Sequence, residues 1–311
     1  MSSFWAFPGQ GAQQADMLHA LPSDPLIGEC LREASDALNE EVLDLDSPES
    51  LQSTRSVQLC LLIAGVACSR LLMARGNAPD YVAGLSIGAY PAAVIAGALS
   101  FADAVRLVAL RGELMQGAYP QGYGMTALIG LDQGVVERLV AQVHSPRSPV
   151  YLANINADNQ FVIAGNDQAM ADVASLAKGD GAATAKRLAV SVPSHCELLS
   201  ESAQALAQAF AEVSIQVPTL KYLSGSTARP LFTADKLRDD LAFNMCRVID
   251  WRSTVQTAYE RGARLQIELP PGTVLTGLAR RVFEQGSAVA FQGARLDTLS
   301  ALSREEERRQ L

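Results

Sequence analysis

The chain has 311 residues, of which 49% are hydrophobic and 19% charged, and its formal net charge is −8. This composition is typical of a globular protein with a sizeable core, and the length suits one large domain that carries a smaller inserted one. The acidic balance and the absence of a long basic run argue against binding to nucleic acid.

The longest apolar run, Val57–Cys68, is shorter than the roughly 20 residues that a membrane-spanning helix needs. We therefore expect it to be a buried helix and expect no membrane association. The five cysteines lack CxxC spacing, and the N-terminal segment has no basic, signal-like start. These features predict a cytoplasmic protein with reduced thiols.

The first part of the chain alternates between short apolar strands and helices. A strand at Phe4–Phe7 runs into the turn Pro8–Gly11, which is expected to open a helix. The next expected elements are a buried helix at Ser56–Met73, a strand at Tyr81–Leu85, and helices at Ile87–Ala98 and Phe101–Gln116. Such alternation is typical of an α/β fold with a parallel sheet.

The rhythm then changes to β-α-β-β-α-β, the order of a ferredoxin-like unit. Its expected elements are Met125–Gly130, Asp132–Val143, Val150–Ala157, Gln160–Ala164, Asp167–Lys178 and Ala185–Val190. The α/β alternation returns with a helix near Glu197–Val213, a strand at Leu265–Leu269 and a helix at Val274–Phe283. We therefore predict a hydrolase-like α/β large domain (residues 1–124 and 191–311) and an inserted small ferredoxin-like (α+β) domain (residues 125–190).

The segment Gly84–Gly88 has the form GxSxG and lies between a predicted strand and a predicted helix. This is the context of a nucleophile elbow, in which the turn is too tight for bulky residues on either side of the serine. Ser86 is therefore a candidate nucleophile, and the N–H of Ile87 is the natural first donor to an oxyanion. The pentapeptide also arises by chance in Gly-rich helix starts.

A serine nucleophile needs a general base, and the chain has three histidines. His195 follows a predicted strand and opens a predicted helix, where a loop at the end of a sheet presents a side chain. His19 falls in a predicted polar helix near the N-terminus, and His144 falls in the predicted small domain. His195 is the preferred candidate, although a capping or core histidine would also fit its position.

Arg111 interrupts an apolar face of the predicted helix Phe101–Gln116. Its neighbours one turn away on either side are Leu107, Val108, Leu114 and Met115, so none is acidic. A buried guanidinium must be paired, because its desolvation costs several kcal/mol. The partner is either a carboxylate from elsewhere in the chain or a carboxylate of a ligand, which an arginine binds with two parallel hydrogen bonds.

Other motifs fail. Gly9-Gln10-Gly11 follows a strand but lacks the third glycine of a dinucleotide fingerprint, since Gln14 stands there. The chain has no GxxxxGK[ST] loop, no HExxH and no Cys/His cluster, so we expect neither a nucleotide phosphate site of that kind nor a metal site.

Four ordered segments together resemble the malonyl-CoA:acyl carrier protein transacylase family: Phe7–Gln13, Gly84–Gly88, Arg111–Met115 and Val192–Cys196. The resemblance runs from Phe4 to about Phe283. It implies that Ser86 is acylated, that His195 is its base, that the N–H groups of Gln10 and Ile87 hold the oxyanion, and that Arg111 binds the malonyl carboxylate. It also implies malonyl-CoA as donor, a carrier protein's thiol arm as acceptor, and no metal or redox cofactor.

Two positions depart from the family pattern. Leu85 stands where the family often has histidine before the nucleophile, and Asp250 stands where it often has Gln or Asn before a tryptophan. The resemblance implies that this second position orients the histidine. Asp250 is therefore a candidate for that role, through its backbone carbonyl or through a Ser-His-Asp arrangement.

The segments Gly84–Ala93 and Tyr119–Gly124 are most similar to one branch, the epsilon subunit of bacterial malonate decarboxylase. That resemblance implies a small carrier subunit with a dephospho-CoA-derived arm as the acceptor. The alternative is the housekeeping transacylase of fatty acid synthesis, whose carrier has a phosphopantetheine arm.

Two other classes of function remain open at this stage. A serine esterase or thioesterase uses the same elbow but has no use for an unpaired Arg111. A non-catalytic protein that docks a carrier would not need to keep Ser86, His195 and Arg111 together.

Overall fold

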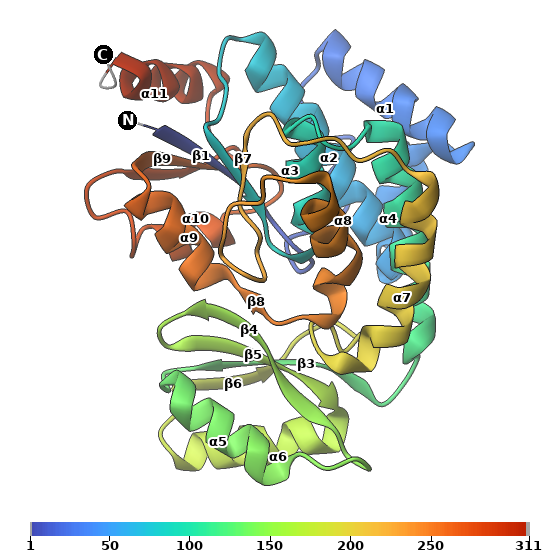
Figure 1. The fold of residues 1–311 in the computed structure, drawn as a ribbon, viewed down its shortest axis with the longest axis vertical. Coiled ribbons are helices and arrows are strands. Elements are labelled where there is room, and N and C mark those ends of the chain that lie inside the picture. Colours follow the sequence, from blue (N-terminus) through green and yellow to red (C-terminus); the bar gives the residue numbers. More distant parts are fainter. Residues whose placement is uncertain (1, 309–311) are drawn as a thin grey trace.

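The computed structural model describes residues 2–308, which form two five-stranded sheets with helices around them (Figure 1). The first sheet is parallel and has the strand order β10-β9-β1-β2-β7. Its strands are β1 (Ser2–Phe7), β2 (Tyr81–Gly84), β7 (Lys221–Tyr222), β9 (Ala263–Glu268) and β10 (Ser287–Ala290). This confirms the predicted α/β class.

Strand β1 is the centre of the first sheet and is buried on both faces. Trp5 and Phe7 belong to the larger hydrophobic cluster, whereas Phe4 and Ala6 belong to a second cluster on the opposite face. Successive side chains of a strand point to opposite faces, so a strand with helices on both sides has to be apolar throughout.

Most helices pack around the first sheet. They are α1 (Pro25–Leu38), α2 (Thr54–Ala74), α3 (Ala89–Ile95), α4 (Phe101–Ala118), α7 (Ser200–Ala209), α8 (Ala234–Phe243), α9 (Trp251–Glu260), α10 (Val274–Ala279) and α11 (Leu296–Arg308). Short 3₁₀ segments stand at Val42–Asp46, Ser50–Gln52, Ser86–Gly88, Glu197–Leu199, Phe210–Glu212 and Asn244–Cys246.

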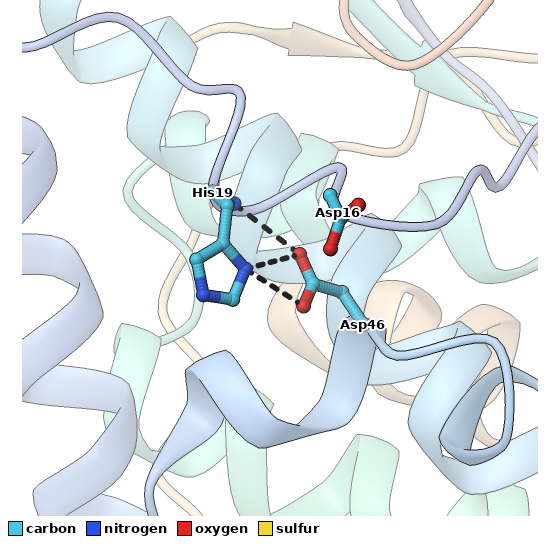
Figure 2. A group of neighbouring side chains, drawn as sticks. All are labelled: Asp16, His19 and Asp46. Atoms are coloured by element: carbon cyan, nitrogen blue, oxygen red, sulfur yellow. Dashed lines mark hydrogen bonds and ion pairs between the residues drawn. The ribbon is translucent and has the colours of Figure 1, made fainter.

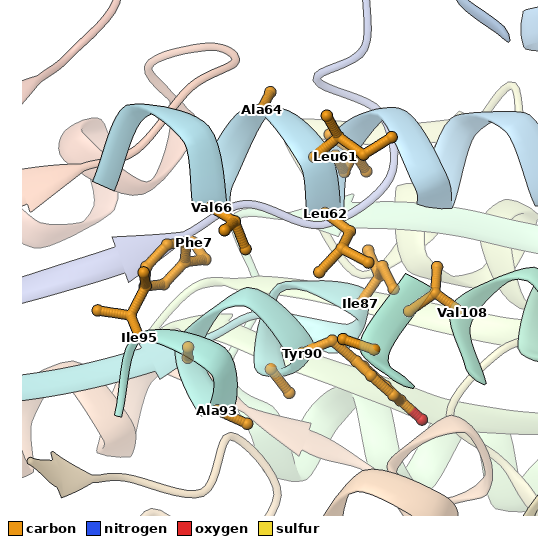
Figure 3. Packing of buried hydrophobic residues seen from close by; sticks show 14 of the residues in the cluster. Phe7, Leu61, Leu62, Ala64, Val66, Ile87, Tyr90, Ala93, Ile95 and Val108 are labelled. Carbon is orange, nitrogen blue, oxygen red and sulfur yellow. The ribbon is translucent and has the colours of Figure 1, made fainter. Parts of the chain in front are cut away.

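Helix α2 is the central helix of the larger cluster. It is long and apolar enough to cross a membrane, but 83% of its most apolar window is buried inside the protein. Figure 3 shows its residues Leu62 and Val66 pointing toward Ile87 and Phe7, so the helix packs directly against the end of β1 and the elbow. The apolar run therefore forms part of the core, as predicted.

The second sheet has the order β6-β3-β5-β4-β8 and forms the lower part of the molecule in Figure 1, where α5 and α6 cover it. Its elements are β3 (Tyr123–Ile129), α5 (Gln133–Val143), β4 (Val150–Ala157), β5 (Gln160–Asn166), α6 (Asp167–Gly179), β6 (Thr184–Arg187) and β8 (Ile249–Asp250). The first four strands are antiparallel in the ferredoxin-like order. The short β8, from far along the chain, adds a parallel strand at the β4 edge.

Two expectations differ from the structure. The turn Pro8–Gly11 opens no helix, because a series of turns follows and α1 begins only at Pro25, after the capping residue Asp24. In place of the predicted helix Ile87–Ala98, the structure has a 3₁₀ turn at Ser86–Gly88 and the seven-residue α3, because the first turn of the expected helix belongs to the elbow.

Two glycines of α4 give a matched test of packing. A Cβ on Gly112 would overlap the backbone of Arg55, whereas a Cβ on Gly117 would meet nothing within 4 Å. We expect Gly112→Ala to lower the free energy of unfolding by roughly 1–3 kcal/mol through overpacking. Gly117→Ala should raise it by up to about 1 kcal/mol, because alanine favours the helix. Urea denaturation of both variants measures the contrast, and equal effects would contradict the helix packing.

Candidate active site

The elbow around Ser86 is a strained turn between β2 and α3. Ser86 has a φ of 57°, in the left-handed region, and only 7% of its surface is exposed. A Cβ on Gly84 would overlap the backbone of Gly88, and one on Gly88 would overlap the Phe7 carbonyl. Only glycine fits at either position, so the GxSxG spacing is a steric requirement of this turn.

The loop after β1 lies directly against the elbow. The Leu85 N–H donates to the Phe7 carbonyl at 2.9 Å, and a Cβ on Gly9 would come within 2.9 Å of the Leu85 carbonyl oxygen. This contact brings the Gln10 segment next to the start of the 3₁₀ turn. Within residues 2–308, neither the Gln10 nor the Ile87 N–H has a hydrogen-bond partner. Both remain free for an oxyanion, the role predicted for them.

His195 is held in one orientation by backbone. Its own φ is 65°, its N–H donates to the Met245 carbonyl at 2.7 Å, and its ring Nδ1 lies 2.8 Å from the carbonyl oxygen of Asn244. A carbonyl only accepts, so Nδ1 carries the proton and Nε2 keeps its lone pair. Burial, with a smaller contribution from the charge of Arg111, lowers the pKa of His195 to about 4. The imidazole is therefore neutral at neutral pH and has the state that a base needs.

Asn244 is one of two residues of the site, with Gln58, that the sequence did not reveal. Besides accepting from His195 through its carbonyl, it donates from Nδ2 to the Ser86 carbonyl at 3.2 Å. Its Oδ1 accepts from Arg111 at 3.0 Å. It thus contacts all three candidate residues. The only signal in the sequence is a polar residue inside the stretch Phe243–Met245, too weak to identify it.

The role predicted for Asp250 is wrong in this structure. Its carboxylate caps α9 by accepting from the Ser253 N–H at 2.9 Å, and its own N–H donates to the Gly225 carbonyl. The carbonyl that His195 contacts belongs to Asn244, six residues earlier. Asp250 stands at a helix start, where Asp favours the capping hydrogen bond.

Arg111 is fully buried and has no acidic partner among residues 2–308. Its NH1 donates to Gln58 Oε1 at 2.7 Å, and its NH2 donates to Asn244 Oδ1 and to Ser86 Oγ, the latter at 3.3 Å. Its Nε is buried without a partner, and its Cζ lies 5.8 Å from the centre of the Tyr90 ring.

Burial lowers the pKa of Arg111 to about 10, so the group stays charged at neutral pH. Every hydrogen-bond partner is neutral, which leaves the charge without a counter-charge beside the Ser86 hydroxyl. Among the described residues no carboxylate pairs this arginine, and pairing with a carboxylate of a ligand stays a prediction. The Ser86 hydroxyl itself accepts from Arg111, and no hydrogen bond joins it to His195 within residues 2–308.

The other two histidines have structural partners. His19 lies in a turn, and its Nδ1 contacts Asp46 at 3.0 Å; Asp46 also accepts from the N–H groups of Leu18 and His19 (Figure 2). Asp16 lies beside this pair, and the ligand atoms of the three side chains are within 4.8 Å of one another. Both Asp46 oxygens already contact His19, so the cluster stabilises the turn. The absence of a metal site stays a prediction.

His144 is the C-cap residue of α5, beside the second sheet. Its Nδ1 contacts the Val150 carbonyl at 3.0 Å, and its ring packs edge-on against Tyr151. Neither His144 nor His19 is thus bonded to the Ser86 elbow, and His195 is the histidine that shares Asn244 with it.

Comparisons with known proteins agree on one family. The model of the acyl transferase domain matches residues 4–308. The malonyl CoA-acyl carrier protein transacylase of Escherichia coli (strain K12) is 37% identical over 295 residues, which cover 92% of this chain and 94% of that protein. The enzyme of the same name from Bacillus subtilis (strain 168) is 31% identical, with 97% and 96% covered.

Solved structures give the same result. The malonyl CoA-acyl carrier protein transacylase of Coxiella burnetii matches with a TM-score of 0.92 at 36% identity and covers 98% of each chain. A malonyl-transacylase solved in complex with its type II PKS acyl-carrier protein matches with a TM-score of 0.91 at 35% identity, with 98% of this chain and 100% of that chain covered.

The lowered pKa of His195 has a consequence for stability. Because its folded pKa of about 4 lies below the unfolded value near 6.5, the unfolded state binds more protons between these values, and stability rises with pH there. We expect His195→Gln to flatten that rise in free energy of unfolding between pH 4 and 6.5, measured by urea denaturation.

His19 provides a control of opposite sign. Asp46 raises the pKa of His19, so its stabilising effect is present below about pH 6.5 and is lost as pH rises through the folded value. His19→Gln should therefore remove a contribution to the free energy of unfolding that becomes smaller as pH rises. An unchanged pH profile for His195→Gln would contradict a buried, neutral imidazole.

Proposed function

The chain belongs to the malonyl-CoA:acyl carrier protein transacylase family, and from this premise we propose that it transfers malonyl from malonyl-CoA, through an ester on Ser86, to the thiol of an acyl carrier protein. The observation that carries the proposal is the buried Arg111, which has no acidic partner in the part of the chain that the structure describes and which donates to the Ser86 hydroxyl. A malonyl thioester brings a free carboxylate to this cation and a carbonyl to this hydroxyl at once.

In the proposed first half-reaction, Nε2 of His195 takes the proton of Ser86 while Oγ attacks the thioester carbonyl. The N–H groups of Gln10 and Ile87 hold the oxyanion, and each such donor is worth roughly 10²–10³ in rate. The C–S bond then breaks, and CoA leaves as a thiol after taking the proton from His195. The second half-reaction reverses these steps with the carrier thiol as nucleophile and returns the proton to Ser86. No step needs a metal or a redox cofactor.

An acyl carrier protein is the better supported acceptor. The curated relatives reported above are named as transferring to an acyl carrier protein, and one solved neighbour is bound to one. The housekeeping alternative therefore becomes the main proposal. The carrier subunit of malonate decarboxylase stays the second candidate, because Gly84–Ala93 and Tyr119–Gly124 resemble that branch.

Intact-mass measurement tests the acyl-enzyme. Wild type mixed with malonyl-CoA should gain one malonyl group, and Ser86→Ala should gain none. Arg111→Ala should lose malonyl uptake by about 10²-fold or more, because a charge-assisted pair is lost, and should take up acetyl from acetyl-CoA instead.

Two outcomes would contradict the proposal. Steady release of CoA without an adduct on wild type would indicate a thioesterase. Neither adduct nor CoA would indicate a protein that only docks a carrier.

The acceptor is tested with malonylated wild type and two carriers, one with a phosphopantetheine arm and one with a dephospho-CoA-derived arm. We expect the first to accept malonyl at least 10-fold faster, measured by loss of the enzyme adduct in single-turnover experiments. The reverse order would support the malonate decarboxylase role. Ser86 chemistry is the same in both cases, so this result bears only on the carrier.

A further inference from the structure

Gln58 is a fully buried polar residue on α2, in a run where its neighbours Val57 and Leu59 are buried apolar side chains. A buried side-chain amide is costly unless both of its ends are hydrogen-bonded. Here both are. Its Oε1 accepts from Arg111 NH1 at 2.7 Å, a short distance typical of a charge-assisted bond, and its Nε2 donates to Gln10 Oε1 at 3.1 Å.

The orientation of this amide is fixed by chemistry. Arg111 can only donate, so the oxygen of Gln58 must face it, and the NH₂ group must face Gln10 and the Met115 sulfur, 3.3 Å away. The oxygen of Gln10 is in turn fixed as the acceptor. One side chain therefore links the guanidinium to the loop that carries the free Gln10 N–H.

The neutrality of this position matters as much as its geometry. Glutamate has nearly the shape of glutamine and would accept from Arg111 equally well, but it would supply a full counter-charge inside the protein. The amide orients the guanidinium without neutralising it. The other two acceptors, Asn244 and the Ser86 hydroxyl, are also uncharged.

We propose that Gln58 is a positioning and specificity-determining residue, which aims Arg111 through a neutral acceptor so that only a substrate carboxylate completes its charge pairing. The proposal rests on the proposed malonyl transfer. The hydrogen bond to Gln10 also joins the guanidinium to the loop that carries the Gln10 N–H. Gln58 touches neither reacting atom, so it acts through Arg111 and Gln10.

Two substitutions at this position separate charge from geometry. Gln58→Glu keeps the acceptor for Arg111 and adds the internal counter-ion; the donation to Gln10 is lost, but the Gln10 side-chain amide can turn and donate to the glutamate instead. Malonyl uptake should therefore fall by at least 100-fold, mainly through KM, while acetyl uptake stays within about 3-fold of wild type or rises. Gln58→Met removes the acceptor without adding charge. It should lower kcat for malonyl about 10-fold and keep the preference for malonyl over acetyl. Rates come from quenched acyl-enzyme formation with each thioester.

Gln116→Glu is the matched control for an added carboxylate. Gln116 lies on α4, where its Oε1 accepts from the Thr54 N–H at 2.8 Å and from Ser53 Oγ, so glutamate keeps those bonds. Its ratio of malonyl to acetyl uptake should match wild type. Thermal unfolding of each variant serves as the folding check, and Gln58→Glu should be no less stable than Gln58→Met, because it pairs the buried cation.

These experiments distinguish failure of the role of Gln58 from failure of the proposed malonyl transfer. If wild type takes up no malonyl, the proposed function fails. If wild type is acylated and Gln58→Glu, folded by thermal unfolding, keeps the wild-type ratio of malonyl to acetyl, the role of Gln58 is overturned and the malonyl transfer stands. An equal loss for both thioesters in Gln58→Glu would also overturn it, since that is the effect of a merely structural residue.

Discussion

The structure is organised around one unpaired charge. Arg111 is a buried residue of α4 that faces α2 and the Ser86 elbow. Removing an isolated cation from water to such a place costs several kcal/mol of free energy. The protein offsets part of that cost with three neutral acceptors and the face of Tyr90. In the proposed function, the charge that remains unpaired favours a substrate with a carboxylate, because that carboxylate would supply the counter-charge that the buried guanidinium lacks.

A second constraint is backbone strain at both candidate catalytic residues. Ser86 and His195 each have a positive φ, a conformation that costs non-glycine residues of the order of 1 kcal/mol and persists only when the surroundings enforce it. For Ser86 the enforcement comes from Gly84 and Gly88, which let the turn close against β1. For His195 it comes from two carbonyls in the Asn244–Cys246 turn.

The sequence predicted the parts of the site whose signals are local. The elbow of Ser86 requires glycines at fixed spacing, and Arg111 stands out because it breaks the apolar face of its own helix. Asn244 and Gln58 could not be found in this way, since each acts through partners more than forty positions away in the chain. The fold class followed from alternation and periodicity, whereas two-residue strands such as β8 have too few positions to show any period.

Asp250 does not orient His195, and its actual position shows how the two sheets are connected. The segment from α8 through the Asn244–Cys246 turn to β8 leaves the first sheet's helices and joins the second sheet, where Asn154 and Ile155 of β4 pair with β8. Asp250 fixes the far end of this segment by capping α9, and Asn244 lies at its near end against His195. The carbonyl that sets the tautomer of His195 is therefore held from both sides. The second sheet therefore helps to position His195, but only indirectly. Its strand β4 pairs with β8, the strand that follows the Asn244–Cys246 turn.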